Sequence, residues 1–239
     1  MPLADVLDAA RARQKTLVVH GASADDFAAY FESRNVDVVE GEPYDESAPF
    51  ATVREDDQFR AAVSLTDLRA YFEPPVEEPD DYPAATHALH ELLDDSVFRS
   101  LSHRQLLATA REIEDRAWRT GTGTLHAGFQ TRAAFERELP HYRRLVEETA
   151  LDVHAYFVPS PGGVSLADEP VTVHETPHPD VGKFWFVVFD GGRTDQQCAL
   201  VAEQHESDAF RGVWTYDSDL VAIALDAVSE VAARQSASG

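Results

Sequence analysis

The hydrophobic positions along the chain switch between helical and strand spacing, most clearly in residues 102–130. In the first part of this segment, apolar residues recur at intervals of three and four, as they do on one face of a helix. This apolar stripe consists of Leu106, Ala110, Ile113 and Ala117. Gly121 is the residue type that ends helices in a left-handed conformation, and Thr124 begins a run typical of a strand. The segment therefore predicts an amphipathic helix that packs on a sheet and leads into one of its strands.

A second row on the same predicted helix is partly polar and contains Leu107, Arg111, Glu114 and Trp118. Arg111 and Glu114 are three residues apart, so their side chains can pair on the helix surface. One interpretation is an ordinary core helix. A sharper hypothesis is that Arg111, Glu114 and Trp118 also border a pocket.

The first third of the chain predicts a strand–helix–strand unit followed by a hairpin and a closing helix. The strands are expected at 16–21 and 36–39, the helix at 25–34, the hairpin at 49–53 and 58–64, and the closing helix at 65–72. Two strands joined by a helix form a parallel pair with a right-handed crossover.

The second half repeats this order of elements. Thr131 is expected to cap a helix over 132–148, with Pro140 inside it as a kink or a break. Strands follow at 151–158, 171–174, 183–190, 198–202 and 210–216, and a last helix starts at Asp217 or Ser218 and ends near residue 233. KFWFVVFD is the most hydrophobic run and predicts a central strand. The fold class is therefore α/β, a mixed β-sheet flanked by helices.

The predicted domains follow from changes in composition. Residues 1–72 form an N-terminal α/β subdomain, and the acidic, proline-rich run 73–83 is a linker or exposed loop because it cannot form a packed element. Residues 84–233, which begin with a helix at 84–94, form the second domain, and 234–239 form a frayed tail. The repeated order indicates duplication of a β-α-β-hairpin-helix unit as one explanation and a separate N-terminal domain as the other.

Acidic residues are spread over the whole chain of 239 residues and give it a net charge of −23. Lys15 and Lys183 are the only lysines. This pattern predicts the cytoplasmic protein of an extreme halophile, because molar salt screens such self-repulsion. An acidic surface that binds basic partners is the alternative. No nucleic-acid partner is expected without a basic stripe, and no membrane partner is expected, since there is no apolar run long enough to cross a bilayer and no signal peptide.

Motif searches predict no catalytic and no metal-binding residues. His174 and His178 match the H-E-x-x-H spacing of zinc proteases, but Pro177 and the preceding VTV run argue against the helix that this motif requires. The glycines near 121–128 follow a helix rather than a strand, which is the reverse of a dinucleotide-binding loop. Cys198, the single cysteine, is expected to be a small buried hydrophobe rather than a redox sensor.

The candidate ligand-binding residues combine flat rings with polar groups that can orient a planar ligand. They are Arg111, Glu114, Trp118, His126, Phe129, Gln130, Trp185 and Trp214. Two alternatives stay open. An enzyme with an unrecognised active site would use His126, His154 or Asp190, and a transcription regulator would bind DNA through Arg99, Arg104 and Arg111.

Several segments together resemble the DICT sensory domain, in the form found in haloarchaea. They are LLATAREIEDRAW, GTLHAGFQ, the helix ending near YRRL, LDVHAYF, WFVVFDGG and CALVAEQ, within residues 98–226. The resemblance implies a signal-input module that binds a small ligand, and it identifies neither the ligand nor a cofactor. Because no cyclase, kinase or DNA-binding segment is evident, the signal is expected to pass to a partner protein or through a homodimer.

Overall fold

The computed structural model describes residues 2–31, 36–43, 48–55, 57–72, 95–101, 103–161, 165–206 and 209–236. These residues divide into a C-terminal unit, residues 1–9 with 100–239, and an N-terminal unit, residues 10–99. Each unit contains a mixed sheet flanked by helices, which confirms the α/β fold class. The predicted linker 73–83 and the predicted helix 84–94 lie outside the described residues.

The N-terminal unit is a four-stranded sheet in the order β2-β1-β3-β4. Strands β1 and β2 are parallel, as predicted, and the other neighbours are antiparallel. Leu17 and Val19 alternate along β1 and pack against Phe27 and Phe31, which lie four residues apart on one face of α2. The elements are β1 (Lys15–His20), α2 (Asp25–Phe31), β2 (Val36–Gly41), β3 (Phe50–Glu55), β4 (Gln58–Ser64) and α3 (Leu65–Phe72).

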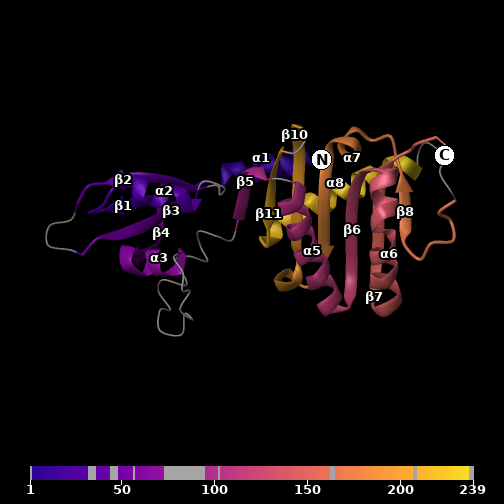
Figure 1. Cartoon of the computed structure of the whole chain (residues 1–239), viewed down its shortest axis with the longest axis horizontal. Coiled ribbons are helices and arrows are strands. Elements are labelled where there is room, and N and C mark those ends of the chain that lie inside the picture. Colours follow the sequence, from indigo (N-terminus) through magenta and orange to yellow (C-terminus); the bar gives the residue numbers. More distant parts are fainter. Residues whose placement is uncertain are drawn as a thin grey trace. The chain divides into compact units, whose positions relative to one another are not determined.

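The C-terminal unit is built on a seven-stranded sheet in the order β5-β11-β10-β9-β6-β7-β8 (Figure 1). Its strands are β5 (Asp95–Leu101), β6 (Thr122–Thr131), β7 (Ala150–Val158), β8 (Thr172–Glu175), β9 (Phe184–Asp190), β10 (Cys198–Glu206) and β11 (Ala209–Thr215). Its helices are α5 (His103–Thr120), α6 (Arg132–Glu148), α7 (Pro179–Lys183), the 3₁₀ turn η1 (Thr194–Gln196) and α8 (Ser218–Ser236), together with the start of α1 (Ala4–Ala12). The KFWFVVFD run becomes β9, which lies between β10 and β6 and is therefore a central strand.

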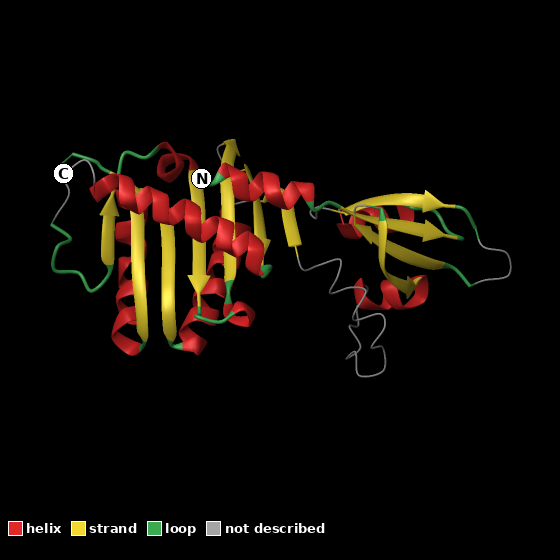
Figure 2. Ribbon diagram, turned by 180° about the vertical axis from the view of Figure 1, so that it is seen from behind, coloured by secondary structure: helices red, strands yellow, loops and turns green. Residues whose placement is uncertain are grey.

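Helices cover both faces of this sheet. The helices α5 and α6 lie on one face (Figure 1), and α8 crosses the opposite face (Figure 2). Phe135 of α6 stacks on Phe157 of β7 with 5.2 Å between ring centroids, and Ile113 of α5 is buried. The chain start belongs to this unit because the Leu3 N–H donates to the Asp180 carboxylate at 2.8 Å. The sequence had grouped residues 1–9 with the N-terminal subdomain.

Local signals set several helix ends in this unit. Gly121 has φ +71° directly after α5, as expected for a left-handed helix stop. The Ala134 N–H donates to Thr131 Oγ1 at 3.2 Å, and α6 continues through Pro140 as a single helix. The last helix, α8, begins beside its cap Asp217 and continues to Ser236, three residues beyond its predicted end.

The two units share one strand pattern. In each, a parallel pair (β1 with β2, β6 with β7) is followed by two antiparallel neighbours (β3 and β4, β9 and β10), which gives the matching orders β2-β1-β3-β4 and β7-β6-β9-β10. The C-terminal unit adds β5, β8 and β11 outside this pattern. The shared pattern supports the predicted duplication, which stays a prediction.

Candidate functional site

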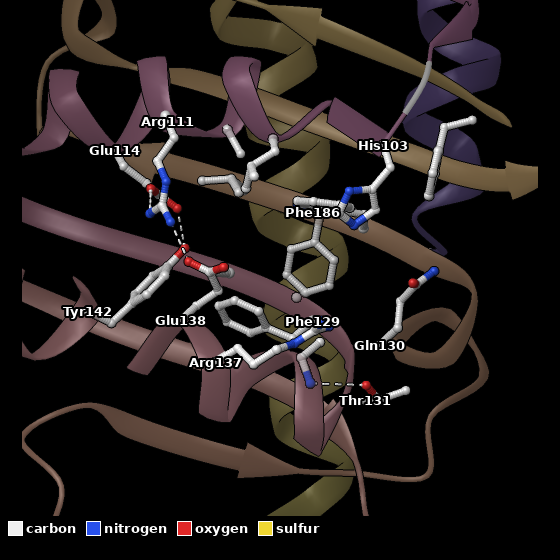
Figure 3. Close-up of a pocket in the computed structure, with 18 of the residues that line it drawn as sticks. His103, Arg111, Glu114, Phe129, Gln130, Thr131, Arg137, Glu138, Tyr142 and Phe186 are labelled. Carbon is white, nitrogen blue, oxygen red and sulfur yellow. Dashed lines mark hydrogen bonds and ion pairs between the residues drawn. The ribbon is translucent and has the colours of Figure 1, made fainter. Parts of the chain in front are cut away.

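A cavity of about 470 Å³ lies on the face of the C-terminal sheet that α5 and α6 cover. It is enclosed by these two helices and strands β6, β9, β10 and β11 (Figure 3). This volume is within the usual range for small-molecule sites, which combine apolar walls with a few polar groups. Its apolar lining consists of Leu107, Ala110, Ala127, Gly128, Phe129, Ala134, Trp185, Phe186, Val187 and Phe210. Its polar lining consists of His103, Arg111, Glu114, Gln130, Thr131, Arg137, Glu138, Tyr142 and Gln204.

The aromatic part of the wall is made by rings from five different elements. The His103 ring meets the Trp185 ring edge-on at 5.1 Å, and Trp185 meets Phe210 at 6.1 Å between centroids. Phe129 contacts Tyr142 at 5.2 Å. The strands β6, β9 and β11 and the start of α5 thus bring together rings that lie up to 107 positions apart in the chain (103 to 210).

One end of the cavity is closed by an ion-pair network between α5 and α6 (Figure 3). Arg111 donates to Glu114 at 2.6 Å, as the sequence spacing predicted, and also to Glu138 of α6. The Tyr142 hydroxyl donates to Glu114 at 2.5 Å, and His141 Nε2 lies 2.9 Å from the other Glu114 oxygen. The network joins the two helices through a carboxylate that is only 3% exposed.

Burial and charge act on this network in opposite directions. Burial lowers the pKa of Arg111, but the carboxylates of Glu114 and Glu138 outweigh it, so the pKa is raised overall and the guanidinium stays charged. Burial, with the nearby Glu114 charge, holds the pKa of Tyr142 well above its usual value. Tyr142 therefore remains a neutral hydrogen-bond donor to Glu114.

The opposite end of the cavity is formed at the turn from β6 into α6. Gln130 adopts φ +58°, a left-handed conformation that is uncommon outside glycine. Its Nε2 donates to the Lys183 carbonyl at 3.2 Å, which ties the turn to the start of β9. The turn holds Gln130 and the capping residue Thr131 at the cavity.

Five of the eight predicted ligand-binding residues line this one cavity, namely Arg111, Glu114, Phe129, Gln130 and Trp185. The structure does not bring Trp118, His126 and Trp214 to it, among the described residues. Arg144 lies over the Trp118 ring, with 5.6 Å to its centroid, and Trp214 packs against Tyr216 at 5.4 Å. His126 belongs to the other face of β6.

The contribution of α6 to the cavity was not predicted from the sequence. Ala134, Glu138 and Tyr142 recur every four residues and face α5, while Arg137 lies next to them on the same side. This spacing is visible in the sequence, but it indicates only a helix face and not what that face meets. His103 and Phe210, which also line the cavity, were not predicted from the sequence.

A histidine cluster lies on the sheet face opposite the cavity. The rings of His126 and His154 stack at 4.9 Å, and His154 Nδ1 lies 2.9 Å from His174 Nε2. His126 also shares a 3.0 Å hydrogen bond with the Tyr156 hydroxyl. Burial above all, with the nearby His154 and His174, lowers the pKa of His126 to about 4, so its ring is neutral at pH 7.

The residues proposed for an unrecognised enzyme only partly converge. His126 and His154 lie side by side, whereas Asp190 accepts hydrogen bonds from the Gly192 N–H at 2.9 Å and the Gln197 amide at 3.0 Å. Asp190 therefore stabilises the β9–η1 turn. Neither histidine lines the cavity within the described part of the chain.

The H-E-x-x-H segment does not form a helix. His174 and Glu175 end strand β8, and His178 caps the separate helix α7. Glu175 accepts a hydrogen bond from Arg132 at 2.7 Å. The two histidines thus do not share one helix face, the geometry that a zinc protease requires.

Two further sequence expectations concern single residues. Cys198 is buried, and burial raises the pKa of its thiol to about 12, which is the opposite of a reactive thiolate. Arg111, a candidate DNA contact, instead forms ion pairs with Glu114 and Glu138, which compensate its charge. The side chain of Arg99 lies outside the described residues.

Replacing Arg111 with methionine should lower the free energy of unfolding by about 3 kcal/mol, because Glu114 would stay buried beside Glu138 without a cation. Urea unfolding at pH 7 measures this. The control is Arg119→Met, since Arg119 is 64% exposed and lies 3.4 Å from Glu112, an exposed pair worth under about 0.5 kcal/mol. Equal losses in both variants would contradict the structural role of the network.

The histidine cluster should make stability depend on pH between about 6.5 and about 4. As the pH falls through this range, the unfolded chain takes up a proton at His126 that the folded chain does not. The free energy of unfolding therefore decreases as the pH decreases. The difference between 6.5 and about 4 corresponds to about 3 kcal/mol. Urea unfolding at pH 7 and pH 4.5 should show a smaller fall for His126→Gln than for the wild type. The exposed His205 serves as a control, because His205→Gln should keep the wild-type fall; an unchanged fall in His126→Gln would refute the assignment.

Comparison with known protein families gives a match over the middle and later part of the chain. The family described as a sensory domain in diguanylate cyclases and two-component systems matches residues 86–205, just over half of the chain. No curated protein and no solved structure matches. Among the described helices, none combines the length and apolar character needed to cross a membrane. On the extent of the match, the chain belongs to the DICT sensory domain family.

Proposed function

We propose that this chain is a signal-input module that binds a small organic ligand in the cavity between α5, α6 and the sheet. The observation that carries the proposal is the position of the cavity: its lining residues, apart from Phe210, all fall within the part of the chain that matches the sensory family. The site combines apolar walls with a few oriented polar groups, as ligand sites do.

The network around Glu114 provides a route for the signal. Arg111 of α5 holds Glu114 of its own helix and Glu138 of α6, and all three side chains line the cavity. A ligand that contacts both helices would favour one spacing of α5 and α6 over another, which is the differential interaction that a conformational response requires. The signal would then pass to a partner protein or across a homodimer.

The charge of the chain supports a finer proposal, that this is a cytoplasmic protein of the haloarchaeal type. A net charge of −23 with two lysines suits a medium in which salt screens repulsion.

Ligand binding can be tested by native mass spectrometry and an absorption spectrum of protein purified in high-potassium buffer. Wild-type protein should carry a bound small molecule. Ala134→Trp should lose it, because Ala134 lines the cavity and an indole there would fill much of the space. The matched control is Ala133→Trp, at the neighbouring exposed position of α6, which should retain the molecule.

Two results would count against the proposal. A bound molecule that Ala134→Trp retains as fully as the wild type would place the ligand outside the cavity. A clean apo mass for the wild type would favour a protein–protein adaptor.

Adaptation to high salt predicts that the unfolding temperature rises as potassium chloride increases towards 1 M, where the screening length falls to about 3 Å. Thermal unfolding followed by circular dichroism measures this. Sucrose, which stabilises without screening charge, is the control. An unfolding temperature that does not change with salt would contradict the halophilic assignment.

A further inference from the structure

The charged side chains of the cavity differ in what they already bind. Arg111, Glu114 and Glu138 are paired with one another. Arg137 also lines the cavity, but it has no ion-pair or hydrogen-bond partner among the described residues. Arg137 is therefore the cation that remains available to a ligand.

The paired residues are poor contacts for a second charged group. An anion that approached Arg111 would meet the repulsion of Glu114 and Glu138. A cation that approached Glu114 would compete with Arg111, the Tyr142 hydroxyl and His141 for oxygens that are already occupied. This network thus forms a closed polar end, and charge recognition falls to Arg137.

The positions of the two helices reinforce this polarity. His103 is the first residue of α5, and Thr131 is the N-cap of α6, and both line the cavity. The cavity runs along the first three turns of both helices, of 18 and 17 residues, so the positive ends of their dipoles lie at one end of it. The positive potential adds to that of the Arg137 guanidinium.

The uncharged wall of the cavity is rich in aromatic rings. Phe129, Trp185 and Phe210 present rings from three strands, and His103 adds a fourth from α5. Aromatic walls of this kind stack favourably on planar, conjugated ligands.

We infer that the cavity takes a planar organic anion whose flat body lies among the aromatic rings and whose carboxylate, phosphate or sulfonate group pairs with Arg137. The inference rests on the proposed function and adds the chemical class of the ligand. Planarity follows from the aromatic wall, and the negative charge follows from Arg137, the lining arginine for which the described residues supply no partner.

Two dyes that differ by one charged group test the inference. Anilinonaphthalene sulfonate and phenylnaphthylamine share the same ring system, and only the first carries a sulfonate. Fluorescence titration at fixed ionic strength should give one binding site per chain for each dye. Arg137→Gln should weaken the sulfonate dye about tenfold, the effect of losing one charge-assisted hydrogen bond, and leave the neutral dye unchanged.

The controls separate the charge from the cavity itself. Arg211→Gln removes an exposed arginine that does not line the cavity in the described chain, and it should leave both affinities unchanged. Ala134→Trp should abolish binding of both dyes.

The outcomes distinguish the two levels of the hypothesis. If Ala134→Trp abolishes binding but Arg137→Gln affects both dyes alike or neither, the cavity remains the binding site and the anionic ligand is refuted. If the wild type binds neither dye, or if Ala134→Trp binds them as well as the wild type does, both the ligand class and the cavity as the ligand site are overturned.

Discussion

The buried carboxylate of Glu114 is the constraint on which the packing around the cavity of the C-terminal unit depends. A carboxylate so far from solvent is tolerated only when its oxygens are satisfied, and here Arg111 and Tyr142 satisfy them from two helices. Because Arg111 also reaches Glu138, the same charges that stabilise the buried group link α5 to α6. The space enclosed between these helices and the sheet is the cavity. The network thus both satisfies the buried carboxylate and closes one end of the cavity.

The sheet of the C-terminal unit presents two chemically different faces. On the side of α5 and α6, aromatic rings and a few polar groups surround the cavity. On the side of α8, the stacked rings of His126 and His154 lie beside His174 and Tyr156. Successive residues of a strand point to opposite faces, so β6 contributes Phe129 to the cavity face and His126 to the face with the histidine cluster. The cavity is the place where a ligand is expected, and the histidine face affects how stability responds to acid.

The N-terminal unit repeats the strand order of the larger unit without its additions. A parallel pair, a helix between its strands and two antiparallel neighbours are common to both. What the C-terminal unit has in addition is β8 beside β7, β11 and β5 on the other side of the pattern, and the long helix α5, which forms one wall of the cavity. The cavity therefore combines elements of the shared pattern, α6, β6, β9 and β10, with α5 and β11, which lie outside it, and duplication of the pattern alone would not produce it.

Hydrophobic spacing by itself determined the helix α5, through its 3.6-residue stripe, and the central strand β9. The Thr131 cap and the pairing of Arg111 with Glu114 follow from local helix geometry. Local spacing also placed five of the cavity residues in segments that could meet. Only the tertiary structure decided which of them do. Trp118 shares the helix row of Arg111 but lies beyond the cavity beside Arg144, and His126 and Phe129 are three residues apart on one strand, which puts them on opposite faces. Arg137, Glu138 and Tyr142 face α5 only because α6 packs beside it. A sequence period specifies one face of an element, whereas a site requires faces from several elements to meet, and that depends on the packing of the whole sheet.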